Sequence, residues 1–283
     1  MGVSIIIPVY NKSNTIAQTI ESVVHQLAAE DELLLIDDGS TDNSAEIIKN
    51  YLADNVILYQ KENGGESDAR NYGIKKAKNE WLAFLDGDDV FSENYLENTK
   101  KHISYFKNKD VVITHMTKQI KGGKTIEKNK QFVEFEKNNR GIEDKGTYYH
   151  IDNFFKTSIK IPIVSASSLV IKKERTVKTG PFIKGIKRGA DREFYIRLFR
   201  ENPELFLLKD SYAILNQDDA QRVSRNIRIP YKHELAYIHR KEKKPFIKSY
   251  LRFHLVRRVI LLLRSGQPLQ AFKLITLLRY HIA

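Results

Sequence analysis

Cysteine is absent from the sequence, and so is any long apolar run. Without cysteine the chain has neither disulfide bonds nor thiolate metal sites, and the composition is compatible with a reducing cytoplasm. The longest purely aliphatic run near the C-terminus, Val259 to Leu263, is far shorter than the roughly 20 residues that a bilayer-spanning helix needs. Met1 to Pro8 has no basic leader and no small-residue cleavage site, so we interpret it as the start of a strand and not as a signal peptide.

Acidic residues are scarce in the last part of the chain. The whole sequence has 47 Lys and Arg against 35 Asp and Glu, a net charge of +12, yet residues 231–283 hold 12 Lys and Arg against Glu234 and Glu242 alone. Almost all of the excess, a net charge of +10, therefore belongs to this tail. A basic tail suits an acidic surface such as anionic lipid or nucleic acid, and the alternative is a merely solvated face.

Short apolar runs alternate with helical patterns in the first part of the chain. Val3 to Val9 is a nearly continuous Val and Ile run, which is typical of a strand buried on both faces of a parallel sheet. We expect strands at residues 3–9, 33–36, 56–59 and 81–85, and helices at 14–27, 45–52 and up to Lys78. Repeated strand–helix–strand units predict an α/β, Rossmann-like fold with a mostly parallel sheet flanked by helices.

The pattern is less regular further on. We expect a helix at 93–106 and a strand at 110–115, followed by a hairpin or mobile excursion at 118–145. Regular structure is expected to resume at 148–156. Further strands are expected at 163–171, 205–208 and 212–215, and a helix is expected to begin near Asp191. We also expect helices at 245–264 and 268–280, joined by Ser265-Gly-Gln-Pro268. Glycine is favoured just after the end of a helix and proline at the start of one, so this segment is typical of a helix–helix connection. The two helices predict a C-terminal basic helical hairpin that either packs on the domain alone or also presents a face to a membrane or partner.

Three carboxylates follow the strand that starts at Trp81. Asp86 and Asp88 are separated only by Gly87, so the chain can turn tightly and direct both side chains to one point, with Asp89 next to them. Oxygen ligands of this kind suit Mg2+ or Mn2+. The alternative is a solvated turn after a strand. Because ligands of parallel sheets bind beyond the carboxyl ends of the strands, the polar residues after the first two strands, Tyr10-Asn11 and Asp37-Asp38-Gly39, are expected at the same site.

Five motifs, in order, resemble those of the family 2 glycosyltransferases with the GT-A fold, which are inverting enzymes that use nucleotide-sugar donors. The resemblance covers residues 4–224. The motifs are Ser4-Ile-Ile-Ile-Pro-Val-Tyr-Asn11, Leu35-Ile-Asp-Asp-Gly-Ser-Thr-Asp42, Asn63-Gly-Gly with Ala69-Arg-Asn-Tyr-Gly73, Phe84-Leu-Asp-Gly-Asp-Asp89, and Gly189-Ala-Asp-Arg-Glu-Phe followed by Arg197-Leu.

The resemblance implies a nucleotide-binding set. Pro8, Val9 and Tyr10 are similar to the wall that receives the nucleobase, with the Tyr10 ring available for stacking. Asp38 is similar to the carboxylate that accepts a hydrogen bond from the base, for which the imide N–H of uracil is suited, and its neighbour Asp37 is interpreted as holding the loop. Arg70 is similar to the arginine that contacts the nucleotide, and the alternative for it is a plain helix-surface arginine.

The resemblance also implies a metal site and a base. Asp86, Asp88 and Asp89 match the DXD motif, whose Mn2+ or Mg2+ ion offsets the charge of the departing diphosphate; Asp88 is the first choice for a direct ligand, and Asp86 also counts as nucleotide-binding. Asp191 matches the catalytic base that takes the proton of an acceptor hydroxyl. The alternative for Asp191 is a helix cap.

Two departures from the family pattern affect the site. Most relatives have Glu-Asp where this chain has Ala190-Asp191, so an acid next to the predicted base is missing. Many relatives carry an Arg-x-His element where this chain has Asn216 to Ser224 without histidine; Gln217, Arg222 or Arg225 are the candidates to replace it. His25, His102, His115 and His150 are scattered and do not have metal-site spacing, so we interpret them as structural or surface residues.

The sequence thus predicts a metal-dependent inverting glycosyltransferase. Its donor is a nucleotide-sugar, most simply a UDP-sugar, and its acceptor is a glycan or a lipid-linked hydroxyl in surface polysaccharide or oligosaccharide synthesis. Residues 1–228 form the catalytic domain, with a nucleotide-binding half at 1–115 and an acceptor half at 116–228, and residues 229–283 form the basic tail. We expect a cytoplasmic enzyme whose residues 231–283 contact the anionic inner face of the membrane.

Two alternatives come from other classes of protein. A nucleotidyltransferase could use a similar sheet, but it needs a Gly-rich loop after the first strand, where this chain has Tyr10-Asn-Lys-Ser-Asn. A basic nucleic-acid-binding protein would fit the net charge, but no recognition module is present, so no nucleic acid is expected as a partner.

Overall fold

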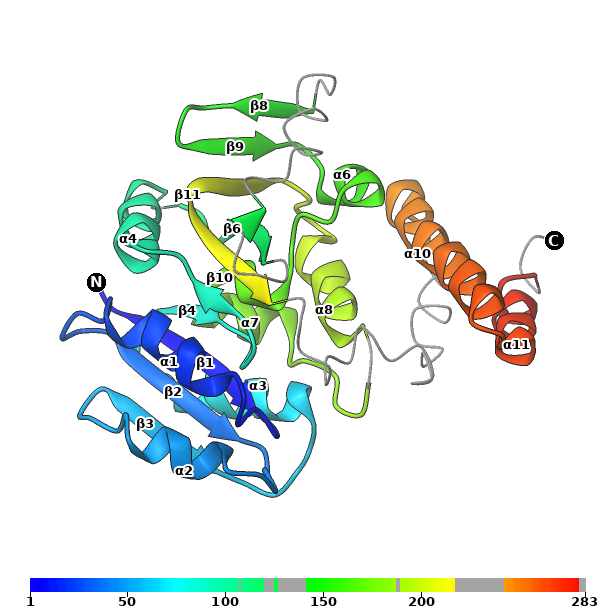
Figure 1. Ribbon diagram of the computed structural model, residues 1–283. Helices are drawn as coiled ribbons and strands as arrows, with labels where there is room; N and C mark the ends of the chain where they lie inside the picture. Colours follow the sequence, from blue (N-terminus) through cyan, green and yellow to red (C-terminus); the bar gives the residue numbers. More distant parts are fainter. Residues whose placement is uncertain (107, 120–124, 127–140, 187–188, 217–241, 280–283) are drawn as a thin grey trace.

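The computed structural model describes residues 1–283 except 107, 120–124, 127–140, 187–188, 217–241 and 280–283. Its strands form one large mixed sheet in the order β3-β2-β1-β4-β10-β6-β11-β9-β8, with β5 paired to β11 and β7 paired to β6. Helices flank this sheet, and a helical hairpin extends from one side of the domain (Figure 1). The predicted α/β fold is therefore confirmed.

The N-terminal half of the sheet is parallel. It comprises β1 (Val3–Val9), β2 (Glu32–Asp37), β3 (Val56–Gln60) and β4 (Trp81–Phe84). All seven residues of β1 are buried, as expected for a central strand covered on both faces. The connecting helices are α1 (Ile16–Val24), α2 (Ser44–Lys49) and α3 (Glu66–Lys76). These four strands lie where the sequence predicted them, and their carboxyl ends meet at one edge of the sheet.

The other half of the sheet contains antiparallel pairs. After β5 (Val90–Phe91) and α4 (Tyr95–Tyr105) come β6 (Val111–Gln119), β7 (Thr125–Ile126), β8 (Ile142–Asp144), β9 (Tyr148–Ile151), α6 (Phe154–Lys160), η1 (Ala166–Ser168), β10 (Leu169–Lys172), α7 (Lys173–Thr179), α8 (Ala190–Phe199) and β11 (Leu205–Asn216). Strand β10 runs antiparallel to both β4 and β6, while β6 and β11 are parallel to each other. The sheet is thus parallel only in part.

Two predicted strand boundaries were wrong. The strand predicted at 163–171 begins only at Leu169, because the Ser168 hydroxyl accepts the backbone N–H of Ser165 and donates to its carbonyl oxygen, which bends residues 166–168 into a 3-10 turn. The strands predicted at 205–208 and 212–215 are one strand, β11, whose register shifts between Leu208 and Tyr212. Most of the excursion predicted at 118–145, and the predicted end of the globular part near Arg228, lie outside the described residues.

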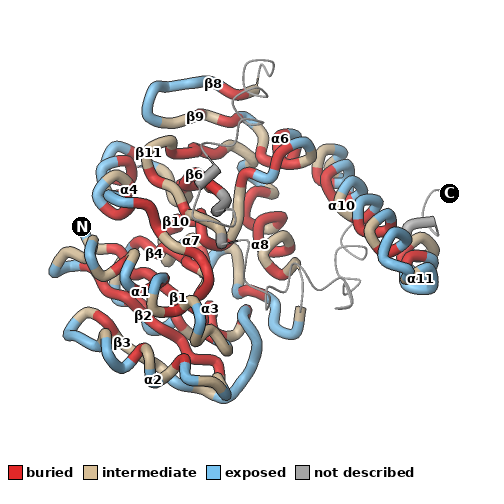
Figure 2. The backbone as a smooth tube through the Cα atoms, viewed as in Figure 1, coloured by how far each residue is buried: buried red, intermediate tan, exposed pale blue. Residues whose placement is uncertain are grey.

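The C-terminal hairpin consists of α10 (Pro245–Arg264) and α11 (Pro268–Arg279). Its boundaries agree with the prediction, and the glycine between the helices, Gly266, has a left-handed φ of 70°. Helix α10 packs on α6: its Tyr250 ring lies 5.6 Å from Phe154 and 5.5 Å from Phe155, centroid to centroid. Buried residues of α10 belong to the same core cluster as β1, β4 and α8, and Figure 2 shows buried, intermediate and exposed residues mixed along the hairpin. The division into domain and tail at residue 228 stays a prediction.

Candidate nucleotide and metal site

Pro8, Val9 and Tyr10 lie at the carboxyl end of β1. Pro8 and Val9 are within the buried strand, whereas Tyr10 is 48% exposed just beyond it. The next residue, Asn11, has a left-handed φ of 52°, and its side-chain oxygen accepts a hydrogen bond from the backbone N–H of Thr41 at 2.8 Å. This turn joins the ends of β1 and β2 and leaves the Tyr10 ring open to solvent.

Asp38 holds the glycine-rich loop before α3. Its buried carboxylate accepts hydrogen bonds from the backbone N–H groups of Gly64 at 2.9 Å and Gly65 at 2.7 Å, and from the Lys61 amine at 2.5 Å. Asp37 has a similar local role, since it accepts hydrogen bonds from the Ser40 backbone N–H and the Gln60 amide. A carboxylate has about four lone-pair sites, so Asp38 keeps acceptor capacity beyond these three bonds.

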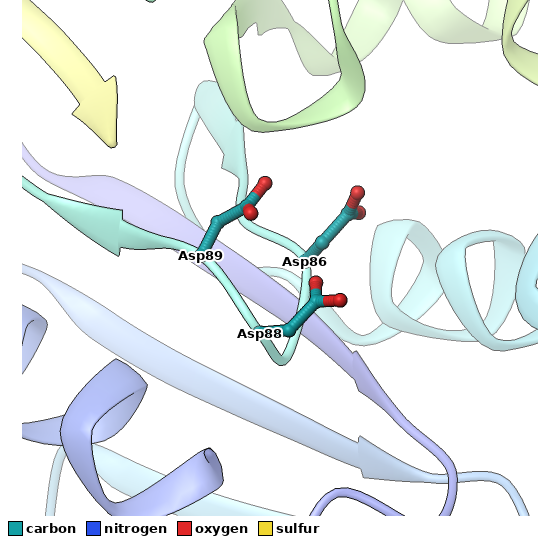
Figure 3. Close-up of side chains that lie close together, drawn as sticks. All are labelled: Asp86, Asp88 and Asp89. Carbon is teal, nitrogen blue, oxygen red and sulfur yellow. The ribbon is translucent and has the colours of Figure 1, made fainter. Parts of the chain in front are cut away.

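The three carboxylates after β4 gather at one point. Asp86, Asp88 and Asp89 offer oxygen atoms that all lie within 4.8 Å of one another, and Figure 3 shows the side chains together in the loop that follows β4. A Cβ at position 87 would lie 3.2 Å from the Pro8 carbonyl oxygen, which is a tight contact. Gly87 has no Cβ and therefore allows this turn. Three hard oxygen donors at this spacing fit Mn2+ or Mg2+.

The three carboxylates differ in exposure and in partners. Asp86 is the most exposed of them, with 27% of its side chain accessible, and it pairs with Arg70 at 2.7 Å. Asp88 is buried and pairs with the Lys12 amine at 3.1 Å. Asp89 is also buried and accepts a hydrogen bond of 2.7 Å from the Ser167 hydroxyl, whose oxygen accepts the backbone N–H of Asp86 at 3.1 Å. Ser167 therefore ties the acidic loop to η1.

Arg70 lies between two carboxylates. Its guanidinium pairs with Glu66, one turn earlier on α3, and with Asp86, and it lies 5.6 Å from the centre of the Phe182 ring. Burial alone would lower the pKa of Arg70, but the carboxylates of Glu66 and Asp86 outweigh it and raise this pKa. Arg70 is thus buried and directed at the acidic loop, which excludes a plain helix-surface arginine.

Asp191 occupies the first turn of α8. The residue that precedes the helix, Gly189, is its N-cap and has a φ of 86°, and no side-chain capping bond is present there. The Glu66 side chain is 54% exposed, and its pKa is raised by partial loss of water around it and by the negative charges of Asp86, Asp191 and Asp88. The Asp191 carboxylate therefore lies within electrostatic range of Glu66, and Glu66 is next to Arg70.

The loop before α8 is held by two polar side chains. Asn71 forms two hydrogen bonds with the backbone of Phe182, donating at 2.8 Å and accepting at 2.9 Å. Arg197 donates to the carbonyl oxygens of Thr179, Gly180 and Pro181 and pairs with Glu193. The first of these side chains comes from α3 and the second from α8, so they fix the distance between the helix of Arg70 and that of Asp191.

Sequence reasoning missed three residues of this site: Lys12, Glu66 and Ser167. Lys12 and Glu66 lie inside or next to quoted motifs, and their charge was the available signal. Ser167 lies in a segment predicted as strand, so nothing in the sequence pointed to it. The candidates for the missing Arg-x-His element, Gln217, Arg222 and Arg225, lie outside the described residues.

The sequence matches a known family. Residues 4–175, more than half of the chain, match the model described as glycosyl transferase family 2, so the chain belongs to that family. A relative of wide coverage is the minor teichoic acid biosynthesis protein GgaA of Bacillus subtilis, which is 30% identical over 261 residues, or 83% of this chain and 58% of GgaA. The chain spans less than two thirds of the length of the curated relatives it matches. For example, it covers 17% of an uncharacterized glycosyltransferase of Rickettsia bellii, with 42% identity over 118 residues, or 41% of this chain.

Solved structures agree on the fold. The structure of S. aureus TarS 1-349 in complex with UDP-GlcNAc aligns with 90% of this chain and with 73% of the TarS chain. The TM-score is 0.71 and the sequence identity is 19%. GalNAc-T7 with UDP, GalNAc and Mn2+ covers 76% of this chain, with 44% of its own length matched, a TM-score of 0.57 and 17% identity. These likenesses confirm the GT-A-like fold that the motifs predicted. Within the described ranges, no helix is both long enough and apolar enough to pass through a bilayer.

Proposed function

We propose that the protein transfers a sugar from a UDP-sugar to a hydroxyl group of a glycan or lipid-linked acceptor in the synthesis of a surface polysaccharide. The observation that carries the proposal is the cluster of Asp86, Asp88 and Asp89 beside Arg70, at the edge where the parallel strands end. Family membership favours glycosyl transfer over nucleotidyl transfer or nucleic-acid binding. The TarS complex with UDP-GlcNAc and the teichoic acid role in the name of GgaA support the donor class and the pathway class.

One set of residues binds the nucleotide-sugar donor in the proposed reaction. Pro8, Val9 and the exposed Tyr10 ring receive the base, together with the remaining acceptor capacity of Asp38, and Arg70 faces the diphosphate. Asp86, Asp88 and Asp89 would hold Mn2+ or Mg2+, with Asp88 as the first direct ligand and Asp89 kept in place by Ser167. When bound, the ion offsets the negative charge that develops on the departing diphosphate.

Asp191 is the general base of the proposed reaction. It takes the proton of the acceptor hydroxyl as the oxygen attacks the anomeric carbon, and the C1–O bond to the diphosphate breaks. Because attack and departure occur on opposite sides of this carbon, a single displacement inverts its configuration.

A thermal-shift panel of UDP, GDP, TDP and CMP, each with and without Mn2+, tests the donor class. We expect stabilisation by UDP that depends on metal, because a ligand that binds only the folded state raises its stability. Asp88→Ala is expected to abolish the metal-dependent part of the shift. Asp191→Asn is expected to keep the UDP shift and to lose sugar transfer, which separates binding from chemistry. A shift with every nucleotide, or one indifferent to metal, would contradict the proposal.

The proposal extends to the place of the reaction. The net charge of +10 in residues 231–283 fits a cytoplasmic enzyme that meets a lipid-linked acceptor at the anionic inner face of a membrane.

A further inference from the structure

Helix α10 has a row of large apolar side chains that face solvent. Phe253, Val256, Ile260 and Leu263 are each at least 36% exposed. Their spacing of three, four and three residues places them on one side of an α-helix. At 20 residues, α10 is about 30 Å long, and this outward stripe runs along its second half.

The opposite side of α10 is already used. Ile247, Leu251, Leu255 and Leu262 are buried, and they belong to the core cluster that also contains Ala271 and Leu274 of α11. The start of α10 is fastened to the domain as well, because buried Glu242 pairs with Arg200 at 2.8 Å. The outward stripe is therefore not needed to hold the hairpin in place.

Arginines flank the outward stripe on both sides. With 100° between successive residues, Arg252 lies on one flank, and Arg257 and Arg264 lie on the other. All three are exposed. On α11, Leu269 and Phe272 are also strongly exposed, next to the exposed Lys273. An apolar stripe between cationic flanks is the arrangement of helices that lie in the plane of a lipid surface.

The charge decides between a membrane and a second copy of the chain. A two-fold interface brings the same patch of both subunits together, so arginines would face arginines. Residues 231–283 have 12 basic residues and two acidic ones, too few to pair them across such an interface. An anionic lipid surface offers the missing negative charge and an apolar interior in one place.

We propose that the outward stripe of α10, with Arg252, Arg257 and Arg264, is the surface by which this protein docks on anionic bilayers. The apolar side chains enter the boundary between headgroups and acyl chains, and the guanidinium groups contact lipid phosphates. This proposal specifies the surface that makes the membrane contact of the proposed function. It rests on the proposed function only for the reason why the protein docks. The docking itself depends on no catalytic residue.

Flotation of the full chain with vesicles tests the proposal. The vesicles are phosphatidylcholine alone or phosphatidylcholine with phosphatidylglycerol. We expect flotation only with the anionic vesicles, weakened by salt. Ile260→Glu is expected to weaken binding at least about tenfold, because burial of an isoleucine side chain is worth roughly that factor. Each of Arg252→Gln, Arg257→Gln and Arg264→Gln is expected to weaken it about fivefold.

Val177→Glu is the matched control. Val177 is 73% exposed on α7, away from the hairpin, so its replacement is expected to leave flotation unchanged. The UDP and Mn2+ thermal shift, measured on the same variants, is expected to stay at the wild-type value, which separates failure of docking from failure of the proposed function. Equal flotation of wild type and Ile260→Glu would overturn the proposal. So would a dimer in analytical ultracentrifugation that Ile260→Glu dissociates while lipid binding persists.

Discussion

At the residue scale, Ser167 connects the acidic loop to the rest of the sheet through one hydroxyl group. It donates to Asp89 and accepts from the Asp86 backbone. Ser167→Ala removes a donor from a buried carboxylate, so we expect the free energy of unfolding to fall by about 1–3 kcal/mol. The metal-dependent UDP shift is expected to fall as well, since Asp86 and Asp89 lose their common anchor.

Urea unfolding and thermal shift measure both effects, and Ser158→Ala is the control. Ser158 is also buried, but its hydroxyl has no hydrogen-bond partner in the described part of the chain. Its replacement is expected to be nearly neutral in both measurements. Equal losses for the two variants would mean that the hydroxyl of Ser167 has no special role.

The residues predicted from the sequence were those with a chemical signature. Carboxylates after an apolar run are visible in a linear sequence, and Asp86, Asp88 and Asp89 do lie together. Their partners were not visible, because Lys12 is 76 residues away from Asp88 and Ser167 is 78 residues away from Asp89. Pairing over such distances is set by the packing of the sheet.

At the element scale, α3 depends on close contact with the sheet. A Cβ on Gly73 would lie 2.4 Å from Ile6 Cγ2, and Ile6 is fully buried in β1. Gly73→Ala is therefore expected to lower the free energy of unfolding by about 1–3 kcal/mol, since the core cannot yield without strain. Because Arg70 lies one turn earlier on α3, the metal-dependent UDP shift is expected to fall too.

Gly141→Ala provides the comparison for Gly73→Ala, measured by the same urea titration. A Cβ on Gly141 would meet Asp152 at 3.6 Å, an ordinary contact, so little change is expected. If Gly73→Ala were as stable as Gly141→Ala, α3 would not be pressed onto β1 in the way described.

Element boundaries were predictable where the local pattern was strong. The strands β1 to β4 and the helices α10 and α11 were expected nearly at their observed positions, because apolar runs and Gly-Pro boundaries are local signals. The strand expected at 163–171 failed, since side-chain bonds between Ser165 and Ser168 bend the chain there. The two strands expected at 205–208 and 212–215 form the single strand β11 because both segments pair with β6, on either side of a register shift.

At the scale of the whole molecule, the hairpin is both part of the core and part of the surface. Tyr250 is 3% exposed and packs on α6, whereas Phe253, three residues later, faces solvent. We expect Tyr250→Ala to lower the free energy of unfolding by about 3 kcal/mol and Phe253→Ala to change it by less than about 1 kcal/mol. Urea unfolding of the two variants measures this difference, and comparable losses would show that both faces of α10 are packed on protein.

The sequence by itself determined the α/β class, the parallel strands β1 to β4, the acidic loop after β4 and the basic helical hairpin. Each of these follows from local patterns of apolar, glycine and charged residues. Only the tertiary structure decided that Arg70 lies between Glu66 and Asp86, that Lys12 reaches Asp88, and which side of α10 is buried. These features depend on contacts between segments far apart in the chain, and such contacts exist only once the sheet has formed.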